Sequence, residues 1–367
     1  MGQRIDRSTF IAGFAALALG LLAGPCPARA GEIFQFFTGT RQLGMGGAYV
    51  GVVDDETALV TNPAGVGKVR EFTLNLFNPQ VGGSVADTNL INLGNYNQAT
   101  DVQGLLALLN QAKGTAVDGR ASIFPSVVMP NFGVGALYNT RYDALVNPAT
   151  NVYTFNYLSD LSGAMAFSVR FLGGVVKLGF NGRFIDRTEV VLSAPATATG
   201  LSLGSLRREG TGIASDVGLI LSAPIVWLPA ISAVAHDVGG TSYGGRAIAG
   251  AATTFRPADT PTTIDAAFSV FPILGRRAHM ALTFEAHDLL TIGQEVDLMR
   301  RAHVGAEIGF ADFFFVRGGM NQRYWTAGLE FATRFFQLQA ASYGEEIGTP
   351  SATIEDRRWV GAMAIRF

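Results

Sequence analysis

The chain has 367 residues, a formal charge of −2 and 15% charged residues, well below the roughly 25% of soluble domains. This balance gives no support for binding to nucleic acid. Hydrophobic residues make up 48% of the chain and 45 residues are glycine, which favours a membrane sheet with many turns over a soluble core. The single cysteine, Cys26, excludes a disulfide framework and a thiolate metal site.

The first 30 residues have the three parts of a secretory signal peptide. Arg4 and Arg7 supply the positive start, residues 10–23 are apolar, and residues 28–30 (Ala-Arg-Ala) form a small-x-small cleavage site. The apolar run is shorter than the roughly 20 residues of a spanning helix. We therefore predict that the chain is secreted through the inner membrane and that the mature protein begins at Gly31.

A later segment, residues 217–235, carries no charge and is long enough to span a membrane as a helix. It contains Pro224 and Pro229, and prolines remove hydrogen-bond donors and mark turns. We predict a β-hairpin with a proline-flanked turn here, with a helix as the alternative.

From Val69 onward the dominant pattern has period two, which places alternate side chains on opposite faces of a strand. In residues 301–310 one face is uniformly apolar, while the other carries arginine, histidine, glycine and glutamate. A soluble sandwich would share the alternation. However, the segments have about 9–11 residues or more, which is the length of a tilted strand that crosses a membrane. In addition, a barrel with lipid outside and a polar lumen inside has one apolar and one polar face on each strand.

We therefore predict an all-β fold, a transmembrane antiparallel up-and-down β-barrel of about 14 strands formed by residues 69–367. A closed barrel leaves no unpaired backbone edge in lipid. The connections alternate between short and long, apart from short ones near Asn147 and Gln322, which fits short periplasmic turns and longer external loops. The predicted strands are 69–82, 119–129, 131–145, 151–171, 173–190, 212–222, 228–237, 261–271, 277–287, 300–310, 313–320, 324–334, 335–345 and 356–367.

One external loop contains an amphipathic pattern. Residues 101–113 are predicted to form a short helix, with Asp101 at its N-cap and Gly114 after its end. The helix either packs over the barrel mouth or acts as a lid or capture surface for an apolar ligand.

Residues 41–67 read RQLGMGGAYVGVVDDETALVTNPAGVG, and they resemble the N-terminal region of the FadL-like outer-membrane superfamily. That group includes hydrophobic-compound transporters, PorV-type secretion proteins and a TraF-like barrel group. The resemblance implies a barrel of fourteen strands whose lumen holds residues 31–68 as a plug. In the transporters, an apolar ligand is captured outside, passes the plug and leaves through a gap in the wall. The matching residues are Leu43, Gly44, Gly46, Gly47, Asp54, Asp55, Asn62, Pro63 and Gly65.

The residues of this stretch are also consistent with a plug when taken by themselves. Gly46 and its neighbours permit close backbone approach and positive φ, and Asn62-Pro63 is turn chemistry. We expect Asp54 and Asp55 to pair with lumen arginines. A phosphate-binding loop is excluded because no lysine-serine pair follows the glycines.

The last segment alternates apolar residues and ends on an aromatic, Phe367. It resembles the targeting strand of outer-membrane proteins, which implies recognition by the barrel-assembly machinery. The alternative is a last strand with an interfacial aromatic residue.

Several charged residues fall on the predicted lumen face. We predict a charge-paired lattice rather than a metal site, although three histidines make a metal conceivable. No GxSxG motif and no pair of acids with an orienting histidine is present, so we predict neither enzymatic activity nor a cofactor. The lattice residues are His279, Glu285, His287, Arg301, His303 and Glu307.

Two functions remain. The first is passage of small hydrophobic compounds across the bacterial outer membrane. The second is a structural or shuttle barrel in a secretion or conjugation-type assembly. The expected partners are outer-membrane lipid, the barrel-assembly machinery and a small hydrophobic ligand.

Overall fold

The computed structural model describes residues 33–84, 102–111, 113–148, 150–201, 203–248, 255–294, 297–348 and 353–367. The predicted signal peptide, its cleavage site and the mature N-terminus at Gly31 lie outside these residues, as does the predicted helix cap Asp101.

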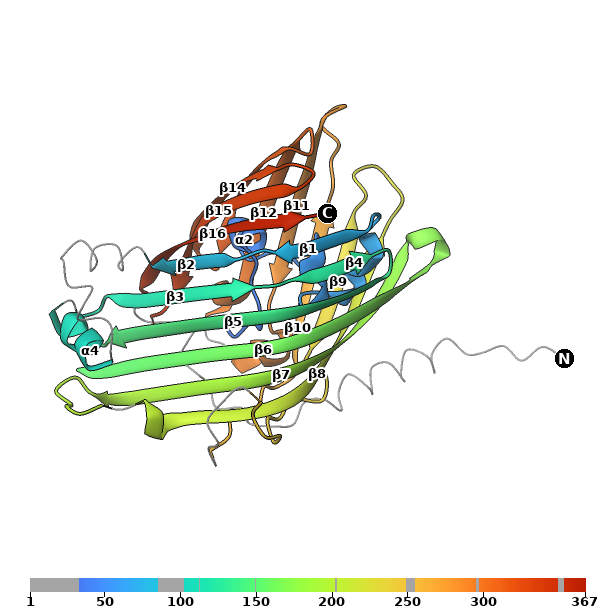
Figure 1. The fold of residues 1–367 in the computed structure, drawn as a ribbon. Coiled ribbons are helices and arrows are strands. Elements are labelled where there is room, and N and C mark those ends of the chain that lie inside the picture. The colour runs from blue at the N-terminus through green and yellow to red at the C-terminus, as the bar shows by residue number, and fades with distance from the viewer. Residues whose placement is uncertain are drawn as a thin grey trace.

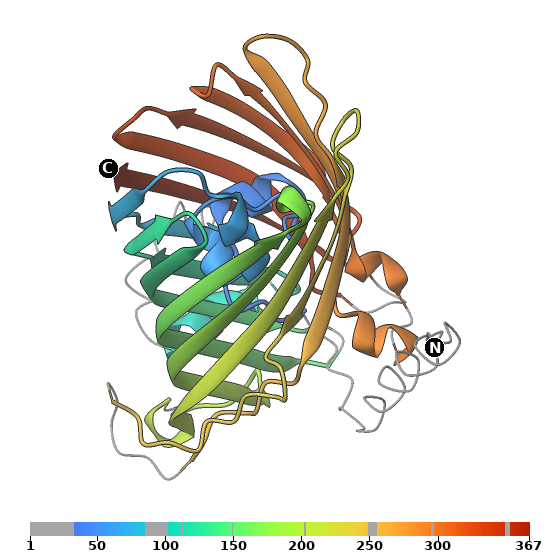
Figure 2. The same ribbon diagram turned by 90° about the vertical axis from the view of Figure 1, so that its right-hand side faces the viewer.

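The described residues form sixteen strands in a single antiparallel sheet that closes on itself (Figures 1 and 2). Both β1 and β2 pair with β16, and both β3 and β4 pair with β5. Each of these two couples therefore occupies one position in the wall, which has fourteen positions as predicted. The strands are β1 Thr73–Phe77, β2 Gln80–Ser84, β3 Ala116–Ile123, β4 Ser126–Met129, β5 Phe132–Val146, β6 Val152–Phe171, β7 Val176–Pro195, β8 Arg207–Ser222, β9 Ala230–His236, β10 Thr263–Val270, β11 Ala278–Ala286, β12 Ala302–Phe310, β13 Phe314–Asn321, β14 Tyr324–Ala332, β15 Phe336–Glu346 and β16 Glu355–Arg366.

The predicted strands 69–82 and 119–129 are each interrupted in the structure. The breaks fall at Asn78-Pro79 and at Phe124-Pro125, because proline has no N–H to donate to the ladder. They lie side by side, since β1 pairs with β4 and β2 pairs with β3. Between them the side-chain oxygen of Asn78 accepts a hydrogen bond from the backbone of Phe124 at 2.7 Å. We call this place the wall interruption.

The wall is tall on one side and short on the other. Strands β6 and β7 have 20 residues each, whereas β9 has 7 and β10 has 8. The external part of β8 extends past β9 and pairs instead with the following loop, through a bridge between Thr211 and Gly245. Residues 217–235 form the predicted hairpin of β8 and β9. No helix within the described residues is long and apolar enough to cross a membrane.

The two faces of the wall differ as the period-two pattern predicts. On β12, Val304 is 40% exposed on the outer face, while the neighbouring His303 and Glu307 are buried on the inner face. On β14 the outward Leu329 is exposed and Glu330 is buried. An apolar outer surface and a polar interior are what a membrane-spanning barrel requires.

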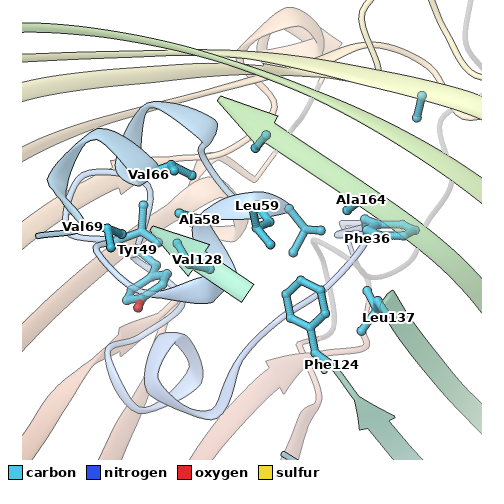
Figure 3. Close-up of a cluster of buried hydrophobic side chains, with 14 of the residues drawn as sticks. Phe36, Tyr49, Ala58, Leu59, Val66, Val69, Phe124, Val128, Leu137 and Ala164 are labelled. Atoms are coloured by element: carbon cyan, nitrogen blue, oxygen red, sulfur yellow. The ribbon is translucent and has the colours of Figure 1, made fainter. Parts of the chain in front are cut away.

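Residues 33–69, which we call the inner segment, lie inside the barrel (Figure 2). The segment contains the helix α2 Thr40–Gly44 and the 3-10 turns η1 Glu56–Leu59 and η2 Pro63–Lys68. Its apolar side chains form a core with inward-facing wall residues. In Figure 3, Phe36 and Leu59 of the segment gather with Phe124 and Leu137 of the wall.

The predicted external helix is present as α4 Val102–Gln111. Its leucines pack against Tyr153 and Phe155 of β6 and Leu192 of β7. These strand residues share the alternation of the exposed, outward-facing Leu161 and Phe184. The helix therefore lies against the outer face of the tall wall, neither covering the mouth nor forming a lid (Figure 1). The remaining 3-10 turns are η4 Leu172–Gly174, η5 Gly204–Leu206, η6 Leu289–Gln294 and η7 Leu298–Arg301.

Candidate functional site

The glycines of the Leu43–Gly47 motif bring the inner segment into backbone contact with the wall. Gly46 and Gly47 have φ values of 69° and 81°, which favour glycine. A Cβ on Gly46 would lie 2.3 Å from the carbonyl oxygen of Val304 on β12. Gly44 packs closely on Gly328 of β14, and the buried Leu43 packs on Val360 and its neighbours. The motif therefore docks the segment on β12 to β16.

The Asn62–Gly65 motif docks the segment on the other side of the lumen. The Asn62 side chain accepts a hydrogen bond from the Ala64 backbone at 3.1 Å and caps η2, and Pro63 occupies the first turn. A Cβ on Gly218 of β8 would lie 2.0 Å from the Asn62 oxygen. Gly65 packs against Val53 within the segment.

Asp54 and Asp55 pair with an arginine of the inner segment, which itself lies in the lumen. Both accept hydrogen bonds from Arg41 of the same segment, at 2.7 Å and 3.1 Å. Arg41 is itself bound to Glu307 of β12. Burial acts to raise the pKa of Asp55, but the Arg41 charge and hydrogen bonds from Thr57 and Tyr49 hold it below its usual range. The acidic pair orients Arg41 toward the wall.

The predicted lattice divides into two groups at different heights in the lumen. Toward the end of the barrel that carries the short turns, Arg317 bridges Glu307 and Glu330. Toward the opposite end, Glu285 accepts hydrogen bonds from the backbone N–H groups of Tyr49 and Val50, both at 2.7 Å; we call this second set the external group.

The external group continues through two histidines. His287 is 2.6 Å from the second oxygen of Glu285, and its ring stacks on that of His303 with centroids 3.9 Å apart. His303 contacts the carbonyl oxygen of Gly46 at 2.9 Å. Glu285, His287 and His303 therefore hold the inner segment.

The other two predicted lattice residues lie near opposite ends of β11, and the carbonyl oxygen of Arg301 accepts a hydrogen bond from the backbone N–H of His287 at 3.0 Å. Arg301 pairs with Asp288 at 3.0 Å, just beyond the external end of β11. His279 is at the other end of β11, half exposed and 3.7 Å from Asp312. The period-two pattern places them on the lumen face, but it does not give their height along the barrel.

A cavity of about 410 Å³ lies beside the inner segment. One part of its lining is charged and includes Arg41, Glu307 and Arg317. Another part is formed by Asn78, Gln80, Ser122, Phe124 and Val128, so the cavity reaches the wall interruption. The rings of Phe37 and Phe124 lie 5.8 Å apart in this part and supply its apolar surface.

Sequence reasoning missed three residues of this region. Arg41 lies inside the recognised motif, yet only the fold shows that it spans from Asp54 to Glu307. Asp265 of β10 joins Glu285 and His287. Glu56 lines the cavity, and burial together with the nearby charge of Asp55 raises its pKa to about 7.

Comparison of the structure with solved structures finds similar barrels. The toluene transporter TodX of Pseudomonas putida is 11% identical with a TM-score of 0.53, and the match covers 92% of this chain and 99% of that chain. The toluene transporter TbuX of Ralstonia pickettii is 12% identical with a TM-score of 0.51, covering 90% and 98%. This chain has the fold of the toluene transporters.

The CymD monoaromatic hydrocarbon channel gives the same result, with 11% identity, a TM-score of 0.50 and coverage of 89% and 96%. These likenesses confirm the predicted fold, a closed antiparallel β-barrel. The three solved structures are transporters or channels. No family model and no curated protein matches the sequence.

Proposed function

We propose that this chain is an outer-membrane barrel through which small hydrophobic compounds pass, with the inner segment acting as a plug. The fold that it shares with hydrocarbon transporters supports the proposal. The apolar outer face of the wall supports placement in a membrane. The periplasmic end is taken as the end that carries the short turns.

One observation carries the proposal: the cavity joins the inner segment to the wall interruption. Its 410 Å³ falls in the range of about 300–1,000 Å³ typical of small-molecule sites. An apolar cavity of about 150 Å³ is already enough to hold benzene. A compound of monoaromatic size would therefore fit in the cavity beside the ring pair of Phe37 and Phe124, next to the wall interruption.

The charged part of the cavity sets a limit on this path. Arg41, Glu307 and Arg317 are held by one another and by the inner segment, so an apolar compound gains nothing by contacting them. The favourable route follows the aromatic side, from Phe37 toward Phe124 and the wall interruption. Displacement of the inner segment is needed to connect this cavity to the external side.

The plug is tested by conductance in planar bilayers. An open barrel of about fourteen strands with a polar lumen leaves an aqueous channel. We expect little conductance from the intact protein and strong conductance after deletion of residues 33–66. Equal conductance of the two proteins, both shown to be folded, would refute the plug and leave an ordinary porin.

The path is tested by uptake of labelled toluene into liposomes that contain the barrel. Ser122→Trp places a large ring in the cavity at the wall interruption and should lower uptake strongly. Gly163→Trp is the matched control, since a side chain at this position of β6 meets nothing within 4 Å. Unchanged uptake by Ser122→Trp would contradict the path, even if the plug is real.

One observation favours the alternative role as a structural or shuttle barrel. The turn between β8 and β9 exposes three large apolar residues, Ile225, Val226 and Trp227, which are 63%, 82% and 61% exposed. An apolar tip of this kind suits contact with lipid or with another protein. Mass spectrometry of the material that copurifies in mild detergent distinguishes a protein partner from a lipid-like ligand.

A further inference from the structure

Three side chains that can bind a metal meet on the inner face of the wall at the external group. They are Asp265 on β10, Glu285 on β11 and His287 directly after β11. One ligand atom of each lies within 4.8 Å of those of the other two. The three residues are 6%, 0% and 3% exposed, so water contributes little to their solvation.

The charges around this cluster do not balance among the described residues. Asp265 has one further cationic neighbour, His236, at 3.7 Å. His236 also faces Asp216 at 3.6 Å. If His236 and His287 are both protonated, they supply two positive charges for the three carboxylates of Asp265, Glu285 and Asp216. One further positive charge is needed for balance.

That additional cation is Arg183, and it is already divided between two carboxylates. It contacts Asp216 at 2.7 Å and Asp237 at 3.3 Å. Four buried carboxylates therefore face one guanidinium and two imidazoles. Arg301, which is also nearby, brings a further carboxylate with it, since it pairs with Asp288 at 3.0 Å. Buried charge without compensation is costly, and a dication supplies two positive charges where a proton supplies one.

We propose that Asp265, Glu285 and His287 bind a divalent transition metal, with Zn²⁺ as the ion whose chemistry fits best. Zn²⁺ binds both imidazole nitrogen and carboxylate oxygen, and three protein ligands leave a fourth position for a water molecule. Ca²⁺ and Mg²⁺ prefer sites made of oxygen ligands alone. A metal between His287 Nε2 and Glu285 Oε1 replaces the proton that these atoms share across 2.6 Å.

The inner segment supplies the surroundings of this site. The side-chain amide nitrogen of Gln35 lies 2.8 Å from Nδ1 of His287. With a metal on Nε2, Nδ1 carries a proton, so the amide must turn over to present its oxygen and orient the metal-bound ring. The second oxygen of Glu285 keeps its hydrogen bonds from Tyr49 and Val50. Because part of the site belongs to the segment, metal binding stabilises the seated segment by linkage. This inference does not depend on which compound the barrel passes.

The first test measures bound zinc. The protein is freed of metal with a chelator, dialysed against micromolar Zn²⁺ in detergent and analysed by mass spectrometry of the metal. We expect one Zn²⁺ per chain, loss of this equivalent in Asp265→Asn and in His287→Gln, and no effect of excess Ca²⁺. His279→Gln is the matched control, because His279 has a single carboxylate neighbour and lies outside the cluster.

The second test uses the inner segment as the readout. Zn²⁺ should protect residues 33–69 of the wild type from protease, and Gln35→Ala should weaken zinc binding about 10–100-fold. Absence of a stoichiometric Zn²⁺ in the folded wild type would overturn the proposal without need of any variant. Binding that survives both ligand substitutions, or that is lost equally in His279→Gln, would overturn it as well.

Discussion

Arg41 and Glu307 are joined by two parallel hydrogen bonds, from Nε to Oε2 at 2.9 Å and from Nη2 to Oε1 at 2.8 Å, although 266 residues separate them in the chain. This bidentate pair fixes the distance and the orientation between the inner segment and β12. The segment is therefore held by a directional contact as well as by its apolar core.

Replacing Arg41 should loosen the inner segment while leaving the wall intact. Glu307 keeps Arg317, so the cost should stay below the about 3–5 kcal/mol of breaking a buried ion pair completely. Arg41→Ala should raise conductance in planar bilayers. Arg41→Lys should give a smaller increase, because lysine cannot form the two-point contact. The control is Arg334→Ala, whose side chain lies over Phe335. Conductance unchanged in Arg41→Ala would show that the pair does not hold the segment.

Glu56 should make the seating of the inner segment depend on pH. Its pKa is raised from an ordinary 4.5 to about 7, so the seated state binds the proton more tightly than a displaced segment in water does. Below its ordinary pKa of 4.5, Glu56 is protonated in both states and does not change the free energy of seating the segment. As the pH rises from there toward 7, Glu56 makes the seated state progressively less stable relative to the displaced state. The slope is at most about 1.4 kcal/mol per pH unit.

Proteolysis of residues 33–69 between about pH 5 and about pH 8 measures this effect. The wild type should become more susceptible as the pH rises, and Glu56→Gln should remove most of the change. A profile that is identical in the two proteins would assign the pH dependence to other groups.

Gly46 should not tolerate a side chain. Alanine there would have an unfavourable positive φ and a Cβ about as close to the Val304 carbonyl as the 2.3 Å of the ideal position. We expect Gly46→Ala to expose the inner segment to protease and to raise conductance. Gly163→Ala is the matched control, since its surroundings are open. Equal behaviour of the two variants would contradict the backbone contact.

Phe367 should be needed for efficient assembly. Its backbone exchanges two hydrogen bonds with Leu74, at 2.8 Å and 2.9 Å, and its ring lies 5.8 Å from that of Phe335. Deletion removes the main-chain bonds and the ring, whereas Phe367→Leu removes the ring alone. The folded outer-membrane fraction on an unboiled gel should fall strongly for the deletion and less for Phe367→Leu. Normal levels of the folded deletion variant would leave the residue a merely interfacial role.

Strand positions could be predicted because lipid and lumen impose opposite demands on alternate residues. In β6, for example, the apolar Phe167 and Val169 alternate with Ser168 and Arg170. The wall interruption was missed because Pro79 and Pro125 sit inside otherwise regular patterns. Each proline indicates that one backbone hydrogen bond of the sheet is missing. Only the pairing of β1 with β4 shows that the strand breaks at Pro79 and Pro125 are neighbours in the wall.

The sequence could predict which charged residues face the lumen, but not which of them contact one another. A charged residue on the polar face of a strand is expected in the lumen, and Glu285 and Glu307 are found there. Which groups meet depends on the register between neighbouring strands, and this register placed Asp265 near His287. The arginine that pairs with Asp54 and Asp55 could not be named from the sequence, because Arg41 lies in the inner segment and not on a strand with a period-two pattern.

The unequal strand lengths have a consequence for the order of folding. Strands β6 and β7 are joined by the short turn at η4 and pair along their whole length, so this hairpin forms from contacts that are local in sequence. The seam between β16 and the β1–β2 pair joins opposite ends of the barrel sequence, and contacts of this kind form slowly. We therefore expect the β6–β7 hairpin to form first and the neighbouring strands to pair with it in turn. The seam between β16 and the β1–β2 pair, which contains Phe367, should form last.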